Sequence, residues 1–299
     1  MPDSPSEPIV AILGPGLLGG SIALALRERQ PGTRVHLWAR RESALEVIRQ
    51  AGAAHLASTD VADVVKGASL VVLATPVEIM GDLAARIAPH LSAGALVTDV
   101  GSVKQTVVAS VNTALSGAGT FLGSHPMAGS EKAGFEAARG DLFEQATCIV
   151  TPSEGSCHTT VQRLSAWWSA LGCNILTMSP EEHDRKVARI SHLPHAVAAA
   201  VVRAALAAQP DAALCSGNGF RDATRIAAGD PALWTGIFLE NRQEVLSALE
   251  DARREMALLV EILKRMDEGA LTRFLAEART LRMQVPPASP QPYGSNQSS

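Results

Sequence analysis

The sequence predicts an α/β domain built on a parallel sheet, followed by a second domain that is all helical. Two observations lead to this fold class. Short β-branched runs alternate with helical stretches through the first half, and after Ser179 and Pro180 the chain becomes rich in Ala and Leu. We expect residues 1–179 to form the first domain, residues 180–284 the second, and the Pro- and Ser-rich residues 285–299 a disordered tail.

The expected strands of the first domain are short, apolar and bounded by turn residues. They cover residues 10–13, 35–38, 70–74, 96–100, 121–123 and 148–151, with an edge strand at 174–178. Strands that alternate with helices pair in parallel and carry helices on both faces of the sheet. We therefore expect a single parallel sheet.

The second domain is expected to contain one long helix over residues 232–266. Asp230 serves as its N-cap and Pro231 occupies its first position, while Gly229 ends the preceding segment. Apolar residues recur at three, four or seven positions along it, at Phe238, Val245, Leu249, Met256, Leu259, Val260 and Leu263. This stripe could pack within one subunit, but its length in a small domain favours a homodimer that pairs through the helical domain.

Composition excludes several classes of partner. The chain has 26 basic and 30 acidic residues and a net charge of -4, so no basic field for nucleic acid is expected. The uncharged stretch at residues 9–26 is interrupted by five glycine or proline residues, which argues against a membrane span. The four cysteines lie at irregular separations and predict neither a metal site nor disulfides, as in a cytoplasmic protein.

A glycine turn directly follows the first strand and opens an apolar helix. It has the form G-x-G-x-x-G, with Gly14, Gly16 and Gly19 enclosing Leu17 and Leu18. The first glycine permits the tight turn, the second lets backbone approach a pyrophosphate, and the third lets the helix lie close to the sheet. The first domain is therefore predicted to be a Rossmann-type dinucleotide-binding domain.

The cofactor is expected to be NADP, with NAD as the alternative. An NAD-selective site needs Asp or Glu about 20 residues beyond the last glycine. Here the second strand ends in Trp38, Ala39, Arg40 and Arg41 instead. Two guanidinium groups suit a 2′-phosphate, and Thr75, just after the third expected strand, is assigned to the same site.

Four further stretches carry polar side chains in order behind this turn. They read DVGSVK at 99–104, HPMAGSE at 125–131, SHLPH at 191–195 and GFRDATRI at 219–226. With these stretches, the chain resembles the prephenate/arogenate dehydrogenase family of tyrosine biosynthesis. The resemblance implies oxidative decarboxylation of prephenate or arogenate, to 4-hydroxyphenylpyruvate or tyrosine, with hydride transfer to NADP or NAD. Such a reaction requires no metal.

The resemblance assigns the reacting groups. His125 matches the catalytic histidine that accepts the proton of the substrate ring hydroxyl, and its position suggests a loop at a strand end. Ser102 matches a serine that bonds the same hydroxyl and the histidine, and it could also cap a helix starting at Val103. Arg225 matches the arginine that grips a substrate carboxylate.

Three other side chains are expected around the substrate. His195 matches a second substrate-contacting histidine, turned toward the first domain by a bend at Pro194. Glu131 matches an acidic group near the entrance, and Asp222 is expected to orient Arg225 or to close the site. Trp234 is expected to pack at the domain junction rather than to contact substrate.

Two other functions compete with this interpretation. A β-hydroxyacid dehydrogenase or imine reductase has a similar order of domains but expects a catalytic Lys on the helical domain. A dinucleotide-sensing protein without turnover needs the glycine turn but has no use for His125, Ser102 and Arg225 together. The sequence leaves open the choice between prephenate and arogenate, the strictness for NADP, and inhibition by tyrosine.

Overall fold

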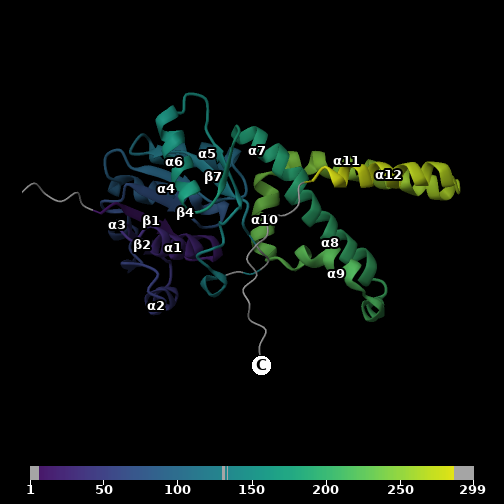
Figure 1. Ribbon diagram of the computed structural model, residues 1–299, viewed down its shortest axis with the longest axis horizontal. Helices are drawn as coiled ribbons and strands as arrows, with labels where there is room; N and C mark the ends of the chain where they lie inside the picture. Colours follow the sequence, from purple (N-terminus) through teal and green to yellow (C-terminus); the bar gives the residue numbers. More distant parts are fainter. Residues whose placement is uncertain (1–6, 130–131, 133, 286–299) are drawn as a thin grey trace, which may run out of the picture.

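The computed structural model describes residues 7–129, 132 and 134–285, so Glu131 and most of the expected tail lie outside the described residues. Figure 1 shows two halves side by side, with the sheets and their helices in one and only helices in the other. The predicted fold class is therefore confirmed. No helix in the described ranges is both long and apolar enough to cross a membrane.

Six parallel strands form the main sheet, in the order β3-β2-β1-β4-β5-β6. The strands are β1 (Ile9–Leu13), β2 (Arg34–Trp38), β3 (Leu56–Ser58), β4 (Leu70–Leu73), β5 (Leu96–Asp99) and β6 (Thr120–Phe121). The strand order reverses between β1 and β4, and ligands of such sheets bind beyond the carboxyl ends of the strands at this point. The glycine turn after β1 lies at this reversal.

Alternate residues of the strands build two separate cores. Val10 and Ile12 of β1 face one core, which includes residues of α1 (Leu17–Arg29), α2 (Glu42–Gln50) and α6 (His158–Ala170). Ala11 and Leu13 face the other, under α3 (Val61–Val65), α4 (Met80–Ile87) and α5 (Gln105–Leu115). Helices thus cover both faces, as the sequence predicted.

The prediction of one parallel sheet was wrong for the last strands. The chain leaves the main sheet after β6 and forms a second sheet from β7 (Gly123–Pro126), β8 (Thr147–Thr151) and β9 (Asn174–Thr177). In it β7 runs antiparallel to β8. The strand expected at 121–123 is therefore divided between two sheets, and His125 lies in a buried strand rather than on a loop.

The helical half contains α7 (Pro180–Val187), α8 (Leu193–Leu206), α9 (Asn218–Thr224), α10 (Pro231–Glu240), α11 (Arg242–Lys264) and α12 (Glu268–Met283). The long helix expected over 232–266 is broken at Asn241, which is buried between α10 and α11. A π-helix at Ala188–His192 joins α7 to α8. Figure 1 shows α11 and α12 lying together and projecting away from the sheets.

Candidate active site

Two glycines keep the turn after β1 close to the sheet. Gly14 has φ of +121°, and a Cβ there would lie 2.5 Å from the carbonyl oxygen of Ala74. A Cβ on Gly19 would lie 2.0 Å from the carbonyl oxygen of Gly14. Both positions therefore require glycine, which agrees with the roles predicted for a tight turn and a closely packed helix.

The start of α1 fits the pyrophosphate of a dinucleotide. Gly16 has open space where a Cβ would lie, and no side chain caps the helix that begins with Leu17 and Leu18. The N–H groups of its first turn have no acceptor within the helix and point toward an approaching anion. Thr75 lies beside Gly14, and its Oγ1 is buried without a partner in the described part of the chain.

Arg40 and Arg41 follow β2, and both are exposed. Arg41 is the N-cap of α2. Within residues 7–129, 132 and 134–285, no carboxylate forms an ion pair with either guanidinium. Both cations are therefore placed at the strand end where the sequence predicted them, and neither charge is neutralised by an acid of the described chain.

A buried ion pair connects the main sheet to β7. Asp99 ends β5 and pairs with Lys104, and both side chains are fully buried. The Asp99 carboxylate accepts the backbone N–H of Ser124 at 3.1 Å, and the Lys104 ammonium donates to the Ser124 carbonyl at 3.0 Å. Burial raises the pKa of Asp99, an effect that Lys104 opposes. Because an unpaired buried charge costs several kcal/mol, this pair fixes the position of Ser124 and of the neighbouring His125.

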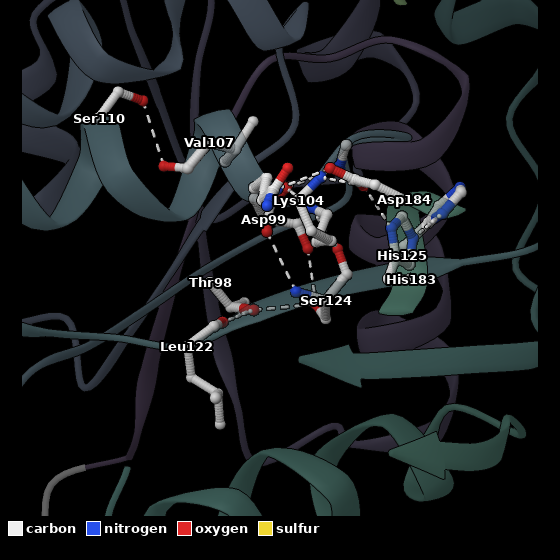
Figure 2. A network of polar contacts seen from close by, with 12 residues as sticks. Thr98, Asp99, Lys104, Val107, Ser110, Leu122, Ser124, His125, His183 and Asp184 are labelled. Carbon is white, nitrogen blue, oxygen red and sulfur yellow. Dashed lines mark hydrogen bonds and ion pairs between the residues drawn. The ribbon is translucent and has the colours of Figure 1, made fainter. Parts of the chain in front are cut away.

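His125 is joined by hydrogen bonds to two further buried side chains, His183 and Asp184 (Figure 2). Its Nδ1 lies 2.9 Å from Nε2 of His183, and Nδ1 of His183 lies 2.7 Å from Oδ1 of Asp184. His183 and Asp184 belong to α7, the first helix of the helical half. The two halves of the protein therefore meet at His125.

Burial keeps the histidines of this region uncharged. It is the largest cause of the low pKa of His125, which lies well below its ordinary value, and His183 and Lys104 lower it further. Burial also lowers the pKa of His183 to about 2 and that of His192 to about 4. The three imidazoles are neutral at neutral pH, and a neutral imidazole is the form that can accept a proton.

Ser102 is half-buried and lies three residues beyond the end of β5. It does not cap α5, because that helix begins at Gln105 rather than at Val103. The side chain that caps the start of α5 is Asp184 of α7. Its carboxylate accepts the backbone N–H of Lys104 at 2.8 Å and that of Gln105 at 2.9 Å. Among the described residues, Ser102 makes no hydrogen bond with His125.

His195 lies on α8 beyond the π-helix and is buried. Its ring stacks on Trp234 at 3.5 Å between centroids and 14° between planes, so Trp234 packs between helices here. The Nδ1 of His195 is buried without a partner in the described ranges. Asn241 donates to the backbone carbonyl of Asp184 at 2.9 Å and lies 3.2 Å from Nδ1 of His192, which is buried.

Arg225 begins a short 3-10 helix, Arg225–Ala228, that contacts α8, the helix of His195. The side chains of Arg225 and Asp222 are exposed. No ion pair joins Asp222 to Arg225 in the part of the chain that the structure describes. The structure thus brings together His125, His183 and Asp184, and separately His195 and Trp234. Arg225 lies on a different segment, next to α8.

Sequence reasoning missed the residues that hold His125 in place. His183 and Asp184 lie in the run PEEHDRKV, whose many charges are typical of a solvated first helical turn. Asn241 lies inside an apolar helical pattern, where a single amide gives little signal. The adjacent His and Asp directly after the predicted domain boundary were the only hint in the sequence.

The glycine turn, the open start of α1 and the neutral buried histidine beside the same sheet define a dinucleotide-dependent dehydrogenase. The comparisons then specify the family. A model described as prephenate dehydrogenase, nucleotide-binding domain, matches residues 22–177, and one described as prephenate dehydrogenase, dimerization domain, matches residues 179–277.

Individual relatives agree with these matches. Prephenate dehydrogenase of Bacillus subtilis is 35% identical over 285 residues, which cover 93% of this chain and 76% of that protein. Cyclohexadienyl dehydrogenase of Zymomonas mobilis is 32% identical over 92% of this chain and 94% of that protein. The crystal structure of A. aeolicus prephenate dehydrogenase in complex with hydroxyphenyl propionate and NAD+ has a TM-score of 0.87 at 33% identity, covering 95% of this chain and 100% of that one.

This chain belongs to the prephenate dehydrogenase family. Both domains are matched in the predicted order, which selects this family over the β-hydroxyacid dehydrogenase and imine reductase alternatives.

Proposed function

We propose that this protein is an NAD(P)-dependent prephenate/arogenate dehydrogenase of tyrosine biosynthesis. The observation that carries the proposal is the neutral, buried His125 at the junction of the dinucleotide domain and the helical domain. One ring nitrogen of His125 is occupied by His183. The other has no hydrogen-bond partner among the described residues and is the nitrogen offered to a substrate.

The reaction removes a hydride and carbon dioxide from a cyclohexadienol, and the proton of the ring hydroxyl moves to a base and back. His125 takes the proton of the ring hydroxyl, so that the oxygen can form a carbonyl as the ring carbon loses its hydride. When the ring carboxylate leaves as carbon dioxide, the electrons of the broken bond make the ring aromatic and place a negative charge on the oxygen, which takes the proton back from His125 to give the phenol. When bound, the nicotinamide supplies the hydride acceptor, and Gly14, Gly16, Gly19 and Thr75 would hold its dinucleotide.

The remaining substrate groups are assigned to the side chains expected from the sequence. Arg225 binds a carboxylate, because its planar set of donors matches two carboxylate oxygens. Ser102 bonds the ring hydroxyl. The Nδ1 of His195 has no partner among the described residues, which supports a substrate contact near the side-chain end. Asp222 and Glu131 are assigned to the entrance.

Steady-state assays with prephenate and with arogenate test this function directly. The purified chain is expected to reduce NADP or NAD with at least one substrate and to release one carbon dioxide per hydride transferred. Comparison of kcat/KM between the two substrates decides whether the side-chain end prefers a keto or an amino group. Absence of turnover with both substrates and both cofactors would overturn the proposal.

The preferred cofactor is proposed to be NADP. Arg40 and Arg41 present two exposed cations at the end of β2, where an NAD-selective site carries an acid. Charge-assisted hydrogen bonds contribute about 1.5–3 kcal/mol each, so Arg40→Ala is expected to lower kcat/KM for NADP by roughly 10- to 100-fold and to leave NAD nearly unaffected. Arg34→Ala, at the other end of β2, is the matched control. Equal or better efficiency of the wild type with NAD would contradict this preference.

The protein is proposed to act as a homodimer through its helical domain. Sixteen of the eighteen exposed large hydrophobic residues in the described ranges lie after residue 179. On α11, Met256, Val260 and Leu263 share one face and are 63%, 46% and 55% exposed, whereas Val245 near the start of the same helix is buried. An exposed apolar face of this kind is typical of a subunit interface.

A further inference from the structure

The hydrogen bonds that link Asp184, His183 and His125 all run in the same donor-to-acceptor direction, and Asp184 determines this direction. Both of its carboxylate oxygens accept hydrogen bonds from backbone N–H groups, Oδ1 from Lys104 and Oδ2 from Gln105. These groups lie at the start of α5, an eleven-residue helix whose N-terminus favours a negative charge. With both oxygens engaged as acceptors, Asp184 is a carboxylate that receives a hydrogen bond from His183.

The proton positions of the two imidazoles follow from this direction. His183 is neutral and carries one ring proton, because burial strongly disfavours its charged form. That proton lies on Nδ1, which faces Oδ1 of Asp184 at 2.7 Å, so Nε2 of His183 is an acceptor. His125 must then donate from Nδ1 across the 2.9 Å contact. Its single proton is thereby used, and Nε2 of His125 carries a free lone pair.

We propose that His183 and Asp184 are positioning residues, which hold His125 in the tautomer whose Nε2 accepts the substrate proton. This inference deepens the proposed function and rests on it. Neither residue needs to touch the substrate. In the opposite tautomer, Nε2 of His125 would carry a proton and would have no lone pair with which to accept another.

Among the described residues around His125, no other side chain is placed to fix its tautomer. Besides His183, the titratable groups that act on its ring are Lys104 from the segment before α5 and His192 from the π-helix, and the Cys148 thiol of β8 contacts its backbone. Lys104 is committed to Asp99 and to the Ser124 carbonyl. Among the described residues, only His183 makes a hydrogen bond with the His125 ring.

The test is the proton position itself, measured by NMR of the full-length protein labelled with ¹⁵N in its histidines. The His125 resonances, assigned by their loss in His125→Asn, are expected to show a protonated Nδ1 and a bare Nε2 without substrate. His36 is the internal reference, because its Nδ1 lies 3.1 Å from the Val64 carbonyl, which can only accept. A protonated Nε2 in wild-type His125 would overturn the proposal, whether or not any variant folds.

Asp184→Asn tests the consequence for the reaction. An amide has one acceptor oxygen, whereas the carboxylate accepts from Lys104, Gln105 and His183 together, so the hydrogen bond that fixes the two tautomers is weakened. We expect kcat to fall by on the order of 10²- to 10⁴-fold, with KM changed by less than about threefold. The His125 resonances should no longer show Nδ1 alone protonated, while the dissociation constant for NADP stays unchanged and reports intact folding. Asp60→Asn is the matched control, because Asp60 caps α3 without contacting a histidine. An unchanged kcat together with an unchanged tautomer would overturn the proposal.

Substitution of His183 provides a rescue experiment. His183→Gln retains an acceptor and a donor, whereas His183→Leu retains neither, so the Gln variant is expected to keep more of kcat at equal cofactor affinity. Equal losses in the two variants would contradict a positioning role. If the wild type oxidises neither prephenate nor arogenate, the proposed function fails, but the wild-type tautomer still decides the role of His183 and Asp184.

Discussion

At the scale of single residues, the site depends on groups that are buried but must not be charged. His125 can take up a proton only if it is neutral beforehand, and burial ensures this by lowering its pKa. The cations nearest to it are neutralised by partners, as Lys104 is by Asp99. Because its pKa is low, His125 is uncharged in the resting site, and it can therefore accept a proton during the reaction.

His125→Asn is expected to lower kcat by on the order of 10²- to 10⁴-fold, the range for loss of a general base. The dissociation constant for NADP should stay the same, because the glycine turn is untouched. His158→Asn, an exposed histidine at the start of α6, is the matched control and should keep full activity. Turnover of His125→Asn at the wild-type rate would remove His125 from the mechanism.

The stability of the protein is expected to fall as the pH drops below 6.5. His183 and His192 have pKa values of about 2 and about 4 when folded, against 6.5 ordinarily. The unfolded chain therefore binds more protons below pH 6.5, and the stability present above this value is lost as the pH falls toward the folded values. Each group contributes roughly 1.4 kcal/mol per pH unit.

Urea unfolding at a series of pH values measures this effect. His192→Gln is expected to reduce the slope of the unfolding free energy against pH between pH 6.5 and about 4. His158→Gln should leave the slope as it is, since His158 is exposed. Equal slopes in wild type and His192→Gln would show that His192 does not contribute to acid stability.

At the scale of elements, the turn between β1 and α1 tolerates no side chain at its third glycine. Gly19→Ala would place a Cβ 2.0 Å from the carbonyl oxygen of Gly14, which forces the helix away from the turn. We expect the dissociation constant for NADP to rise by at least about tenfold and the melting temperature to fall, as measured by calorimetry. Gly32→Ala, where a Cβ meets nothing within 4 Å, is the control.

The elements also show what the sequence could and could not predict. Five strands of the main sheet and the glycine turn were predictable, because short apolar runs and glycine spacing are local signals. The exception is β3, which has three half-buried residues and no apolar run. The second sheet was not predictable, because its separation from the main sheet depends on the long-range bonds of Ser124 to Asp99.

The same distinction applies to the site. The resemblance identified His125, which lies in a stretch with a recognisable pattern. Asp184 could not be found in this way, because its partners at Lys104 and Gln105 are about 80 residues away in sequence. Likewise, the structural role of Asn241 follows only from its contacts with α7 and the π-helix, which the sequence does not show.

At the scale of the whole molecule, the apolar face of α11 predicts the oligomeric state. Combined Met256→Glu and Val260→Glu substitutions are expected to convert a dimer into a monomer, because they place two like charges in an apolar interface on each subunit. Light scattering coupled to size-exclusion chromatography measures the mass. Lys66→Glu, exposed in the dinucleotide domain, is the control. A monomeric wild type would contradict the homodimer.

The π-helix at Ala188–His192 determines how α8 is rotated relative to α7, the helix that carries His183 and Asp184. One residue in an ordinary α-helix turns the chain by about 100°. If a single residue were deleted from this segment, regular winding would be restored and every side chain of α8 would rotate by that angle. His195 would then leave the indole of Trp234, and the aromatic stack would be lost, while the dinucleotide half, which precedes this segment, would keep its fold. The five residues of the π-helix thus determine how all of α8 is turned about its own axis.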